Sequence, residues 1–574
     1  VGTLQIGGGN NRLPTGTVLR VGNDFNVTTA TFDLNGHNQE VAGLATDGST
    51  MTRTVTNASA TPSTLTVNNS GNYSYSGLVT DNLALTKTGT GTLTLSGENT
   101  YTGATNVNAG VLRINNASAL GGTAAGTTVA DGARIELAGG ITVSGESLTI
   151  SGSGGNNCGA LQTQTGANTW AGNVTLGANN TRIGAVGAGT SLTVSGAIGD
   201  GGNNHALAIY NDGGTTVLSG TNTYSGGTTV SNGILRITKN SALGTGQTTV
   251  SVGAQLELSG GITVSDQTIH ITGYGASGYG ALRSLDGYNV WDGPVYFEGS
   301  DSRVGAVNSD SVLEISGEIR DGTSNKVVTV RNNLGKTIFS GENTYTGETR
   351  IYNGTLELGA HNSLPVGNPL LLGIGSLDPT FDLKGFNQTI GSLRSEGDGT
   401  HTITNTGDSE STLTVTQNSD NVFGGTITNG SNALHLVKAG SSQLTLSGAN
   451  TYTGLTTVNA GTLLVTGSLA NKGSSHVQVA SAGTAFGSAD PTIVRTVAAG
   501  GTFAGLGSQI TGSGTSGTQA DLMAGGNGSG SSLDVAMAWR QFDSAETAAF
   551  PALTNPLSDI VQLTGMGTGE TDPF

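Results

Sequence analysis

One eight-residue motif recurs four times along the chain and constrains its fold more than any other feature. The first copy, residues 96–103, has the sequence Ser-Gly-Glu-Asn-Thr-Tyr-Thr-Gly. The other copies occupy residues 219–226, 340–347 and 447–454. A Thr-rich segment, a turn that contains Gly and a second apolar segment follow each copy. A chain that repeats in this way is built from units that complete one another's apolar faces.

A longer period runs through the middle of the chain. Three pairs of landmark residues have the same offset (291 − 170 = 121, 303 − 182 = 121 and 345 − 224 = 121), namely Trp170 and Trp291, Arg182 and Arg303, and Tyr224 and Tyr345. A constant offset means that insertions between the landmarks are not tolerated, which suits coils stacked in register. Two further stretches, residues 32–112 and 381–465, are copies of a second module.

The composition supports strands and argues against both helices and disorder. Gly accounts for 96 of 574 residues and charged residues for 11%, whereas ordinary domains contain about 7% Gly and about 25% charged residues. The apolar residues alternate with Thr in short runs such as 92–95 and 412–415. Such alternation is the period-two pattern of a strand.

These features predict an all-β fold, a single elongated right-handed parallel β-helix, or β-solenoid. A string of β-sandwiches is the alternative, because a 121-residue unit has about the length of one sandwich. The Asn and Thr content favours the β-helix, since identical side chains on successive coils stack about 4.8 Å apart. At roughly 20 to 25 residues per coil, the chain would form about 25 coils.

We expect six segments. They are opening coils at 1–31, a first module at 32–138, two tandem modules at 139–259 and 260–380, a second copy of the first module at 381–465, and irregular terminal coils at 466–574. The chain starts inside an expected strand without a signal peptide, so we expect it to be a piece of a longer secreted product.

Charge and cysteine content exclude several classes of protein. The net charge of −17 argues against binding to nucleic acid or to anionic membrane surfaces. The single cysteine, Cys158, excludes an internal disulfide and a cysteine zinc site. No run of about 18 apolar residues occurs, so we expect no membrane-spanning helix in this segment.

The repeated motif and the segment after it resemble a known family. Residues 447–465 fit best, with Ser-Gly-Ala-Asn-Thr-Tyr-Thr-Gly followed by Thr-Thr-Val-Asn-Ala-Gly-Thr-Leu. They resemble the autotransporter-associated β-strand repeat, a passenger-associated repeat of bacterial surface proteins, and the resemblance covers most of residues 32–465. It implies a parallel β-helix at the bacterial cell surface, either outer-membrane associated or secreted. It says little about chemistry, because such passengers include adhesins, proteases and esterases.

We therefore expect a non-catalytic, extracellular structural or adhesive β-solenoid. The expected partners are a glycan or a cell surface, with self-association as a further expectation. Two alternatives stay open: a subunit of a self-assembling extracellular fibre, and a β-helix enzyme that acts on polysaccharide.

Acidic residues would have to carry the chemistry of such an enzyme. The candidates are Asp200, Asp321, Asp382 and Glu342, with His205 as a possible partner. Each of these acids has an equivalent in another repeat, and a residue that repeats with the module is expected to serve a turn or a ladder. We therefore expect no catalytic residue.

The sequence predicts no metal site or cofactor of the usual kinds. The seven His residues include no pair at i and i+4, the spacing that would favour a metal site on one helix face. The Gly-Asp-Gly segment at residues 397–399 could bind calcium through oxygen ligands. It lacks the nonapeptide regularity of calcium-binding β-rolls, which favours a plain turn.

Aromatic and Asn residues of the repeats have either a structural or a binding role. We expect a structural clasp, in which Asn forms corners and Tyr seals them, from eight residues: Asn99, Tyr101, Asn222, Tyr224, Asn343, Tyr345, Asn450 and Tyr452. Trp170 and Trp291 are the candidate glycan contacts, because exposed rings at a fixed axial spacing could stack on sugars; inward rings would instead seal a coil. Function is expected where the copies differ, as at Cys158 and Tyr279, and in the segment after residue 466.

Overall fold

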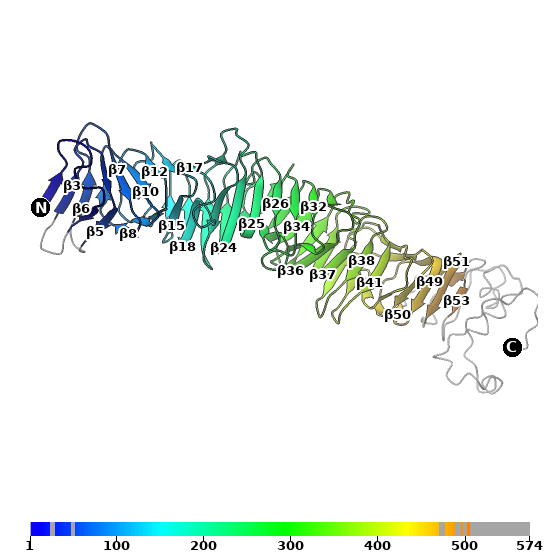
Figure 1. Ribbon diagram of the computed structural model, residues 1–574. Helices are drawn as coiled ribbons and strands as arrows, with labels where there is room; N and C mark the ends of the chain where they lie inside the picture. Colours follow the sequence, from blue (N-terminus) through cyan, green and yellow to red (C-terminus); the bar gives the residue numbers. More distant parts are fainter. Residues whose placement is uncertain are drawn as a thin grey trace, which may run out of the picture. The chain divides into compact units, whose positions relative to one another are not determined.

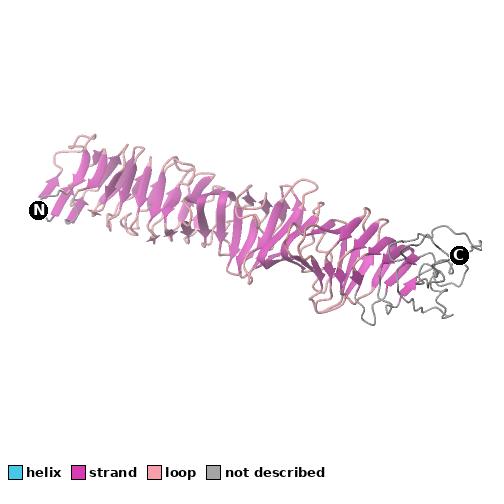
Figure 2. Cartoon of the chain, turned by 90° about the horizontal axis from the view of Figure 1, so that it is seen from below, coloured by secondary structure: helices cyan, strands magenta, loops and turns pink. Residues whose placement is uncertain are grey.

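The computed structural model describes residues 2–22, 29–47 and 52–469, together with the backbone of strands at 477–487, 495–497 and 502–504. In these residues the regular secondary structure consists of strands, and no helix occurs (Figure 2). The chain is a β-solenoid of about 19 turns with parallel sheets. It divides into two compact units, Val1–Pro294 and Val295–Phe574.

Unit 1 contains strands β1 to β31 (Figure 1). One four-stranded sheet comprises β1 (Gly2–Gln5), β3 (Thr29–Asp33), β6 (Thr52–Thr56) and β9 (Leu78–Val79). A two-stranded sheet pairs β2 (Val18–Val21) with β5 (Gly43–Thr46). An eight-stranded sheet comprises β4 (Gln39–Val41), β7 (Ser63–Asn68), β10 (Leu83–Thr88), β12 (Thr105–Val107), β14 (Thr127–Val129), β17 (Leu148–Ile150), β20 (Val174–Leu176) and β23 (Ile198–Gly199).

The other strands of unit 1 belong to a larger sheet. They are β8 (Tyr73–Tyr75), β11 (Thr92–Leu95), β13 (Val111–Ile114), β15 (Arg134–Ala138), β16 (Thr142–Val143), β18 (Leu161–Thr165), β19 (Ala167–Trp170), β21 (Thr181–Ala185), β22 (Ser191–Val194), β24 (Leu207–Leu218), β25 (Thr228–Ile237), β26 (Thr248–Val250), β27 (Gln255–Ser259), β28 (Thr263–Val264), β29 (Ile269–Ile271), β30 (Leu282–Asp286) and β31 (Tyr288–Trp291).

Inward side chains that stack on successive strands, mostly apolar with some Thr, form the core of unit 1. In β7 every second residue is buried, and β10 stacks on it in parallel with Leu85 directly over Leu65. The next steps along this sheet place Thr105 over Leu85 and Thr127 over Thr105. Because adjacent strands lie about 4.8 Å apart, each inward column is continuous. The alternation in the sequence therefore becomes a narrow apolar interior.

The coils differ in length because some of them carry excursions. The step from Leu65 to Leu85 is 85 − 65 = 20 residues, whereas the step from Ile135 to Leu161 is 161 − 135 = 26 residues. The longer coil includes residues 151–160, which lie between β17 and β18. Excursions of this kind, and the residues outside the described part of the chain, explain why about 19 turns are present rather than the expected 25.

Glycine marks the corners where one coil passes directly beneath the next. A Cβ atom added at Gly97 would lie 2.0 Å from the carbonyl oxygen of Gly77, and one added at Gly220 would lie 2.2 Å from that of Gly196. No other residue fits at such a distance without a shift of the backbone. The Ser-Gly start of the repeated motif is therefore a packing requirement.

Unit 2 contains strands β32 to β53 (Figure 1). They are β32 (Val295–Phe297), β33 (Ser302–Ala306), β34 (Val312–Ile315), β35 (Ile319–Asp321), β36 (Val328–Phe339), β37 (Thr349–Leu358), β38 (Pro369–Leu372), β39 (Pro379–Asp382), β40 (Gln388–Ile390), β41 (Ser392–Ser395), β42 (Thr402–Thr404), β43 (Ser411–Val415), β44 (Asn421–Phe423), β45 (Thr426–Ile427), β46 (Leu434–Lys438), β47 (Gln443–Leu446), β48 (Ala449–Asn450), β49 (Thr456–Val465), β50 (Ser468–Leu469), β51 (Val477–Gly487), β52 (Arg495–Val497) and β53 (Thr502–Ala504). The same construction applies, with β46 stacked on β43 so that Leu436 covers Leu413.

The predicted parallel β-helix is confirmed, and β-sandwiches are excluded, because successive coils pair through parallel ladders. The right-handed sense of the coil stays a prediction. So do the six segment boundaries; the division between the two units falls inside the segment expected at 260–380. Most of the segment expected at 466–574 lies outside the described residues.

Candidate functional site

The Asn residue of each repeated motif joins three successive coils. The Oδ1 atom of Asn222 accepts a hydrogen bond from the backbone N–H of Ile198, 2.8 Å away, and its Nδ2 donates to the carbonyl oxygen of Ala242 at 2.5 Å. The same two-sided bonding occurs at the other three motif positions, Asn99, Asn343 and Asn450. All four side chains are buried. Each amide thus satisfies backbone groups at a corner where the strand ladder is interrupted.

The Tyr residue of each motif fills the corner next to this Asn. Tyr101, Tyr224, Tyr345 and Tyr452 are buried. Each phenol oxygen lies 2.5 to 2.6 Å from the hydroxyl oxygen of the Thr four residues later. Burial is the main cause that raises the pKa of these phenols, to about 12 at Tyr452. The rings seal the coil and have no surface for a ligand.

The expectation that Trp170 and Trp291 contact a glycan is wrong. Both side chains have no exposed surface and are among the largest fully buried groups of the described residues. They end strands β19 and β31, whose alternating burial points these rings inward. A ring without exposed area offers no face for a sugar. Each ring stacks on a Val of the preceding coil, Trp170 on Val143 and Trp291 on Val264, with the same offset (264 − 143 = 121).

Three of the four acids proposed for catalysis in the enzyme alternative hold turns, whereas Glu342 is exposed. The carboxylate of Asp200 accepts hydrogen bonds from the backbone N–H groups of Gly202, His205 and Ser225, and from the Ser225 hydroxyl. These donors lower the pKa of Asp200 to about 2 despite the opposing effect of burial. His205 is fixed as well, since its Nδ1 lies 2.8 Å from the carbonyl oxygen of Leu176.

Asp321, the repeat equivalent of Asp200, has the same role, and so has Asp382 of the other module. Asp321 accepts from the backbone N–H groups of Asn325, Lys326 and Thr346. Asp382 accepts from two backbone N–H groups and from a Thr hydroxyl of the next coil. The carboxylates of these three Asp residues are therefore occupied by turn capping.

No group of three or more His, Cys, Asp or Glu side chains stands ready to hold a metal ion within the part of the chain that the structure describes. At the Gly-Asp-Gly segment, the backbone N–H of Asp398 donates to the carbonyl oxygen of Gly375 at 2.7 Å. Calcium binding at this turn stays a prediction.

A buried charge cluster on the large sheet was not foreseen from the sequence. The Glu136 side chain is fully buried. One of its carboxylate oxygens accepts from Arg113 at 2.8 Å, and the other from Arg134 at 2.7 Å and from Gln162 at 3.1 Å. Two guanidinium groups and an amide thus compensate one desolvated charge. The residues stack on successive strands, Arg113 over Glu136 and Glu136 over Gln162.

The next repeat holds the same cluster with two partners exchanged. Glu257 bonds to Arg236 at 2.9 Å, to Gln255 at 2.7 Å and to Arg283 at 3.0 Å. The positions of Gln255 and Arg283 correspond to an Arg and a Gln in the first copy (255 − 121 = 134 and 283 − 121 = 162). Each Glu therefore keeps two Arg and one Gln although the strands that supply them change. Alignment of the two copies would have revealed this compensation.

The sequence also did not predict two buried lysines. Lys87 and Lys438 have no exposed surface and occupy inward positions, each between two Val residues of the neighbouring strands. The Lys87 ammonium donates to the carbonyl oxygens of Thr88, Gly89 and Ala109 at 2.5, 2.8 and 3.1 Å. Burial lowers the pKa of both lysines to about 8. A Lys in the apolar phase of an alternating strand is the signal that could have found them.

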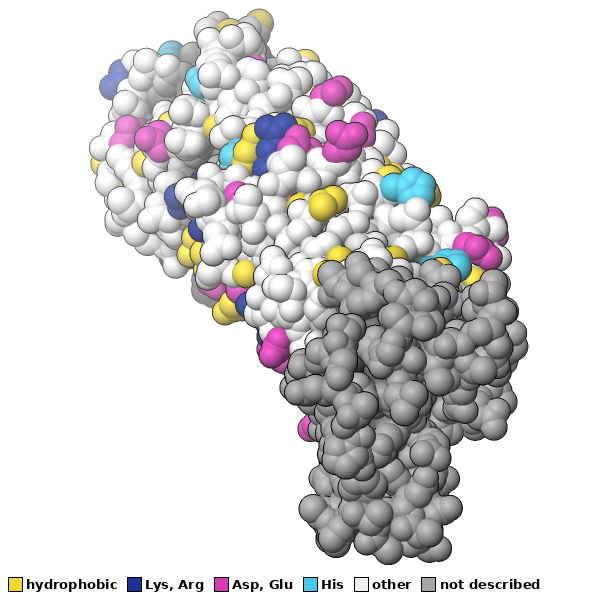
Figure 3. Space-filling model, turned by 90° about the vertical axis from the view of Figure 1, so that its right-hand side faces the viewer, with side chains coloured by type: hydrophobic (Ala, Val, Ile, Leu, Met, Phe, Trp, Pro, Cys, Tyr) yellow, Lys and Arg dark blue, Asp and Glu magenta, His cyan; other side chains and the backbone are white. Residues whose placement is uncertain are grey.

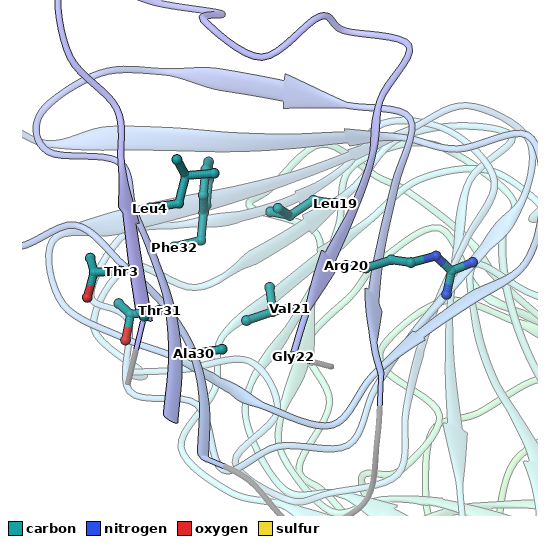
Figure 4. Close-up of a pocket in the computed structure, with 10 residues that line it drawn as sticks. Thr3, Leu4, Leu19, Arg20, Val21, Gly22, Ala30, Thr31 and Phe32 are labelled. Atoms are coloured by element: carbon teal, nitrogen blue, oxygen red, sulfur yellow. The ribbon is translucent and has the colours of Figure 1, made fainter. Parts of the chain in front are cut away.

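A cavity of about 340 Å³ lies at the first coil (Figure 4). Strands β1, β2 and β3 line it, and the side chains of Leu19, Val21 and Phe32 point into it, while Arg20 points away. Leu4 on β1 is 53% exposed. The polar members of the lining are Thr3, Thr31 and Arg20. Two hydroxyls beside an outward-pointing Arg20 are few polar groups for fixing a small ligand.

The described surface is poor in charge. In Figure 3 most of the visible described atoms belong to backbone or uncharged polar side chains, with acidic and basic groups scattered among them. None of the described residues forms a helix long and apolar enough to cross a membrane.

Four segments of the chain match a known repeat, the passenger-associated-transport-repeat. The matched residues are 85–114, 209–237, 332–358 and 436–465. Each of the four matches contains one Asn–Tyr clasp. The chain is a passenger-associated-transport-repeat protein. Its repeats are thus the coil pairs that the buried Asn and Tyr residues hold together.

This passenger-associated-transport-repeat protein is also a distant homologue of an adhesin. It is 30% identical over 488 residues to the adhesin BmaC autotransporter of Brucella suis biovar 1 (strain 1330). The similarity covers 74% of this chain and 13% of that relative. No solved structure matches the chain. The protein is an autotransporter passenger-like β-solenoid distantly related to an adhesin.

Proposed function

We propose that this solenoid is a non-catalytic adhesive scaffold at the bacterial cell surface. The observation that carries the proposal is the use of repeated polar residues for internal bonding: the Asn–Tyr clasps and the Asp turn caps are occupied within the fold. The relative named as an autotransporter adhesin supports an adhesive role and a location at the outer membrane or cell surface.

The adhesive surface should lie where the two tandem copies differ, because the shared residues maintain the coil. Two such positions are Tyr274 and Tyr288, which are 51% and 50% exposed. Their equivalents in the first copy are Ser153 and Ala167 (274 − 121 = 153 and 288 − 121 = 167). Aromatic faces exposed on one copy alone are suited to stack on the sugar rings of a glycan.

Binding of the full chain to a glycan array and to cultured host cells tests this function. The variant Y274S/Y288A gives the second copy the residues of the first, and V422S removes an exposed apolar side chain outside the two tandem copies (52% exposed) as a matched control. We expect binding to fall by about 2- to 10-fold per ring in the first variant and to be unchanged in the control. Equal binding by both variants would contradict a role for these rings.

Catalytic activity on a polysaccharide would contradict the proposal of a non-catalytic scaffold. Release of products from uronate or neutral glycans by the full chain, with loss of turnover in Asp200→Ala, would overturn the non-catalytic proposal. A turn cap predicts instead that Asp200→Ala lowers stability and changes no activity.

Self-association into a fibre, the other non-catalytic alternative from the sequence, is a second candidate and stays a prediction. Electron micrographs that contain only particles of uniform, single-chain length would exclude this candidate.

A further inference from the structure

The two tandem copies place an acid and an amide at the same buried position. Glu146 precedes strand β17 and Gln267 precedes strand β29, with the usual offset (267 − 146 = 121). Their side chains are only 2% and 6% exposed. The pair is a natural comparison of a titratable and a non-titratable group within unit 1.

The amide of Gln267 uses both of its polar atoms. Its Nε2 donates to the carbonyl oxygen of Gly244 at 2.8 Å. Its Oε1 accepts from the hydroxyl of Thr248, 3.3 Å away. The position therefore requires one donor, toward a backbone carbonyl, and one acceptor, toward a Thr hydroxyl.

Glu146 satisfies only half of this requirement as a carboxylate. Its Oε1 accepts from the hydroxyl of Thr127 at 2.6 Å, as Gln267 does from its Thr. Its Oε2 is buried and has no hydrogen-bond partner among the described residues. A buried charged oxygen without a donor is costly, whereas a protonated oxygen can itself donate.

The glycine whose carbonyl accepts from Gln267 has an equivalent in the first copy. Gly121 is the equivalent of Gly244, since both follow the sequence Ser-Ala-Leu and both have a left-handed backbone (φ +76° and +70°). Each packs against the carbonyl oxygen of its clasp Tyr, at 2.5 Å for Tyr101 and 2.3 Å for Tyr224 from the position of an added Cβ.

The surroundings of Glu146 offer no positive charge to balance a carboxylate. Burial raises its pKa, and the Thr127 hydroxyl opposes this in part; no cation of the described residues contributes. The titratable group that faces it is the phenol of Tyr101, which is bonded to Thr105 at 2.5 Å. The neighbouring strands β12 and β14 present uncharged Thr hydroxyls at this point.

We propose that Glu146 is a neutral carboxylic acid in the folded protein at neutral pH, and that its proton on Oε2 is donated to the carbonyl of Gly121. The acid thereby takes the part that Gln267 has in the second copy. Loss of the proton places a charge without a counter-ion between two coils and favours their local opening. The first copy is thus a pH-sensitive element and the second is its insensitive equivalent.

The direction of the effect follows from linkage. A folded pKa above the ordinary value of Glu means that the acid contributes stability at low pH and that this contribution is lost as pH rises toward the folded pKa. Within that interval, the local opening constant increases up to about tenfold per pH unit. Above the folded pKa no further change is expected from this group.

Hydrogen exchange on the full chain tests the proposal, with rates corrected for the intrinsic pH dependence of exchange. We expect the amides of β14 and β17 to open more as pH rises from about 4 in the wild-type protein, and Glu146→Gln to abolish this dependence. The reverse variant Gln267→Glu is the matched test and should transfer the dependence to β26 and β29. Infrared difference spectra of wild type against Glu146→Gln at pH 7 should contain the band of one protonated carboxylic acid.

Two results would overturn the proposal. One is a pH dependence in β14 and β17 that is the same in wild type and in Glu146→Gln. The other is an infrared difference that contains the bands of an ionised carboxylate at pH 7. Either result would mean that the buried carboxylate is stabilised as a charge.

Discussion

Removal of one clasp amide should loosen three coils at once, and Asn222→Ala is the clearest case. The substitution deletes the acceptor of the Ile198 N–H and the donor to the Ala242 carbonyl, both within buried surroundings. Each buried polar group left without a partner costs about 1 to 3 kcal/mol. We therefore expect the free energy of unfolding to fall by about 2 to 6 kcal/mol.

Denaturant unfolding followed by tryptophan fluorescence measures this loss, because Trp170 and Trp291 are buried in the same unit as the clasp. Thr221→Ala is the matched control, since Thr221 is the exposed neighbour of Asn222. Exposed substitutions of this kind are usually within about 0.5 kcal/mol of neutral. Hydrogen exchange of the Ile198 amide adds a local readout, which should accelerate in Asn222→Ala alone.

A loss in Asn222→Ala no larger than that in Thr221→Ala would refute the reasoning. It would mean that the two backbone groups find other partners, or water, at no cost. A large loss without faster exchange at Ile198 would place the effect elsewhere in the coil.

Three further predictions concern packing and buried charge. Gly220→Ala should be strongly destabilising, seen as a lower thermal midpoint, because the new Cβ would meet the Gly196 carbonyl oxygen at 2.2 Å; an unchanged midpoint would contradict the close approach. Stability should rise with pH between about 8 and the ordinary Lys value, because burial lowers the pKa of Lys87 and Lys438 to about 8. Lys87→Met should remove about half of this rise in denaturant titrations. Glu257→Gln should destabilise unit 1 by about 3 to 5 kcal/mol by leaving two guanidinium groups without a counter-charge, and an unfolding midpoint equal to that of wild type would contradict this.

The strands, the stacking of coils and the role of the Asp residues in turns could be predicted from the sequence. Alternating Thr and Leu predicted strands, the 121-residue offset predicted stacked coils, and the equivalence of Asp200 with Asp321 predicted turns rather than catalysis. Each of these inferences depends on spacing along the chain. Spacing survives in a solenoid because each coil packs mainly against its immediate neighbours.

The direction and surroundings of individual side chains were decided by the tertiary structure. Trp170 and Trp291 could point inward or outward from the same repeat, and only the coil geometry makes them fully buried. The partners of Glu136 come from three successive strands, and the lack of a donor to the buried Oε2 of Glu146 is visible only in the packed structure. The sequence thus determined the repeating backbone, through residue types that recur at fixed intervals. Contacts across coils required the fold, because they join residues about 20 to 26 positions apart whose lateral register depends on the length of every intervening corner.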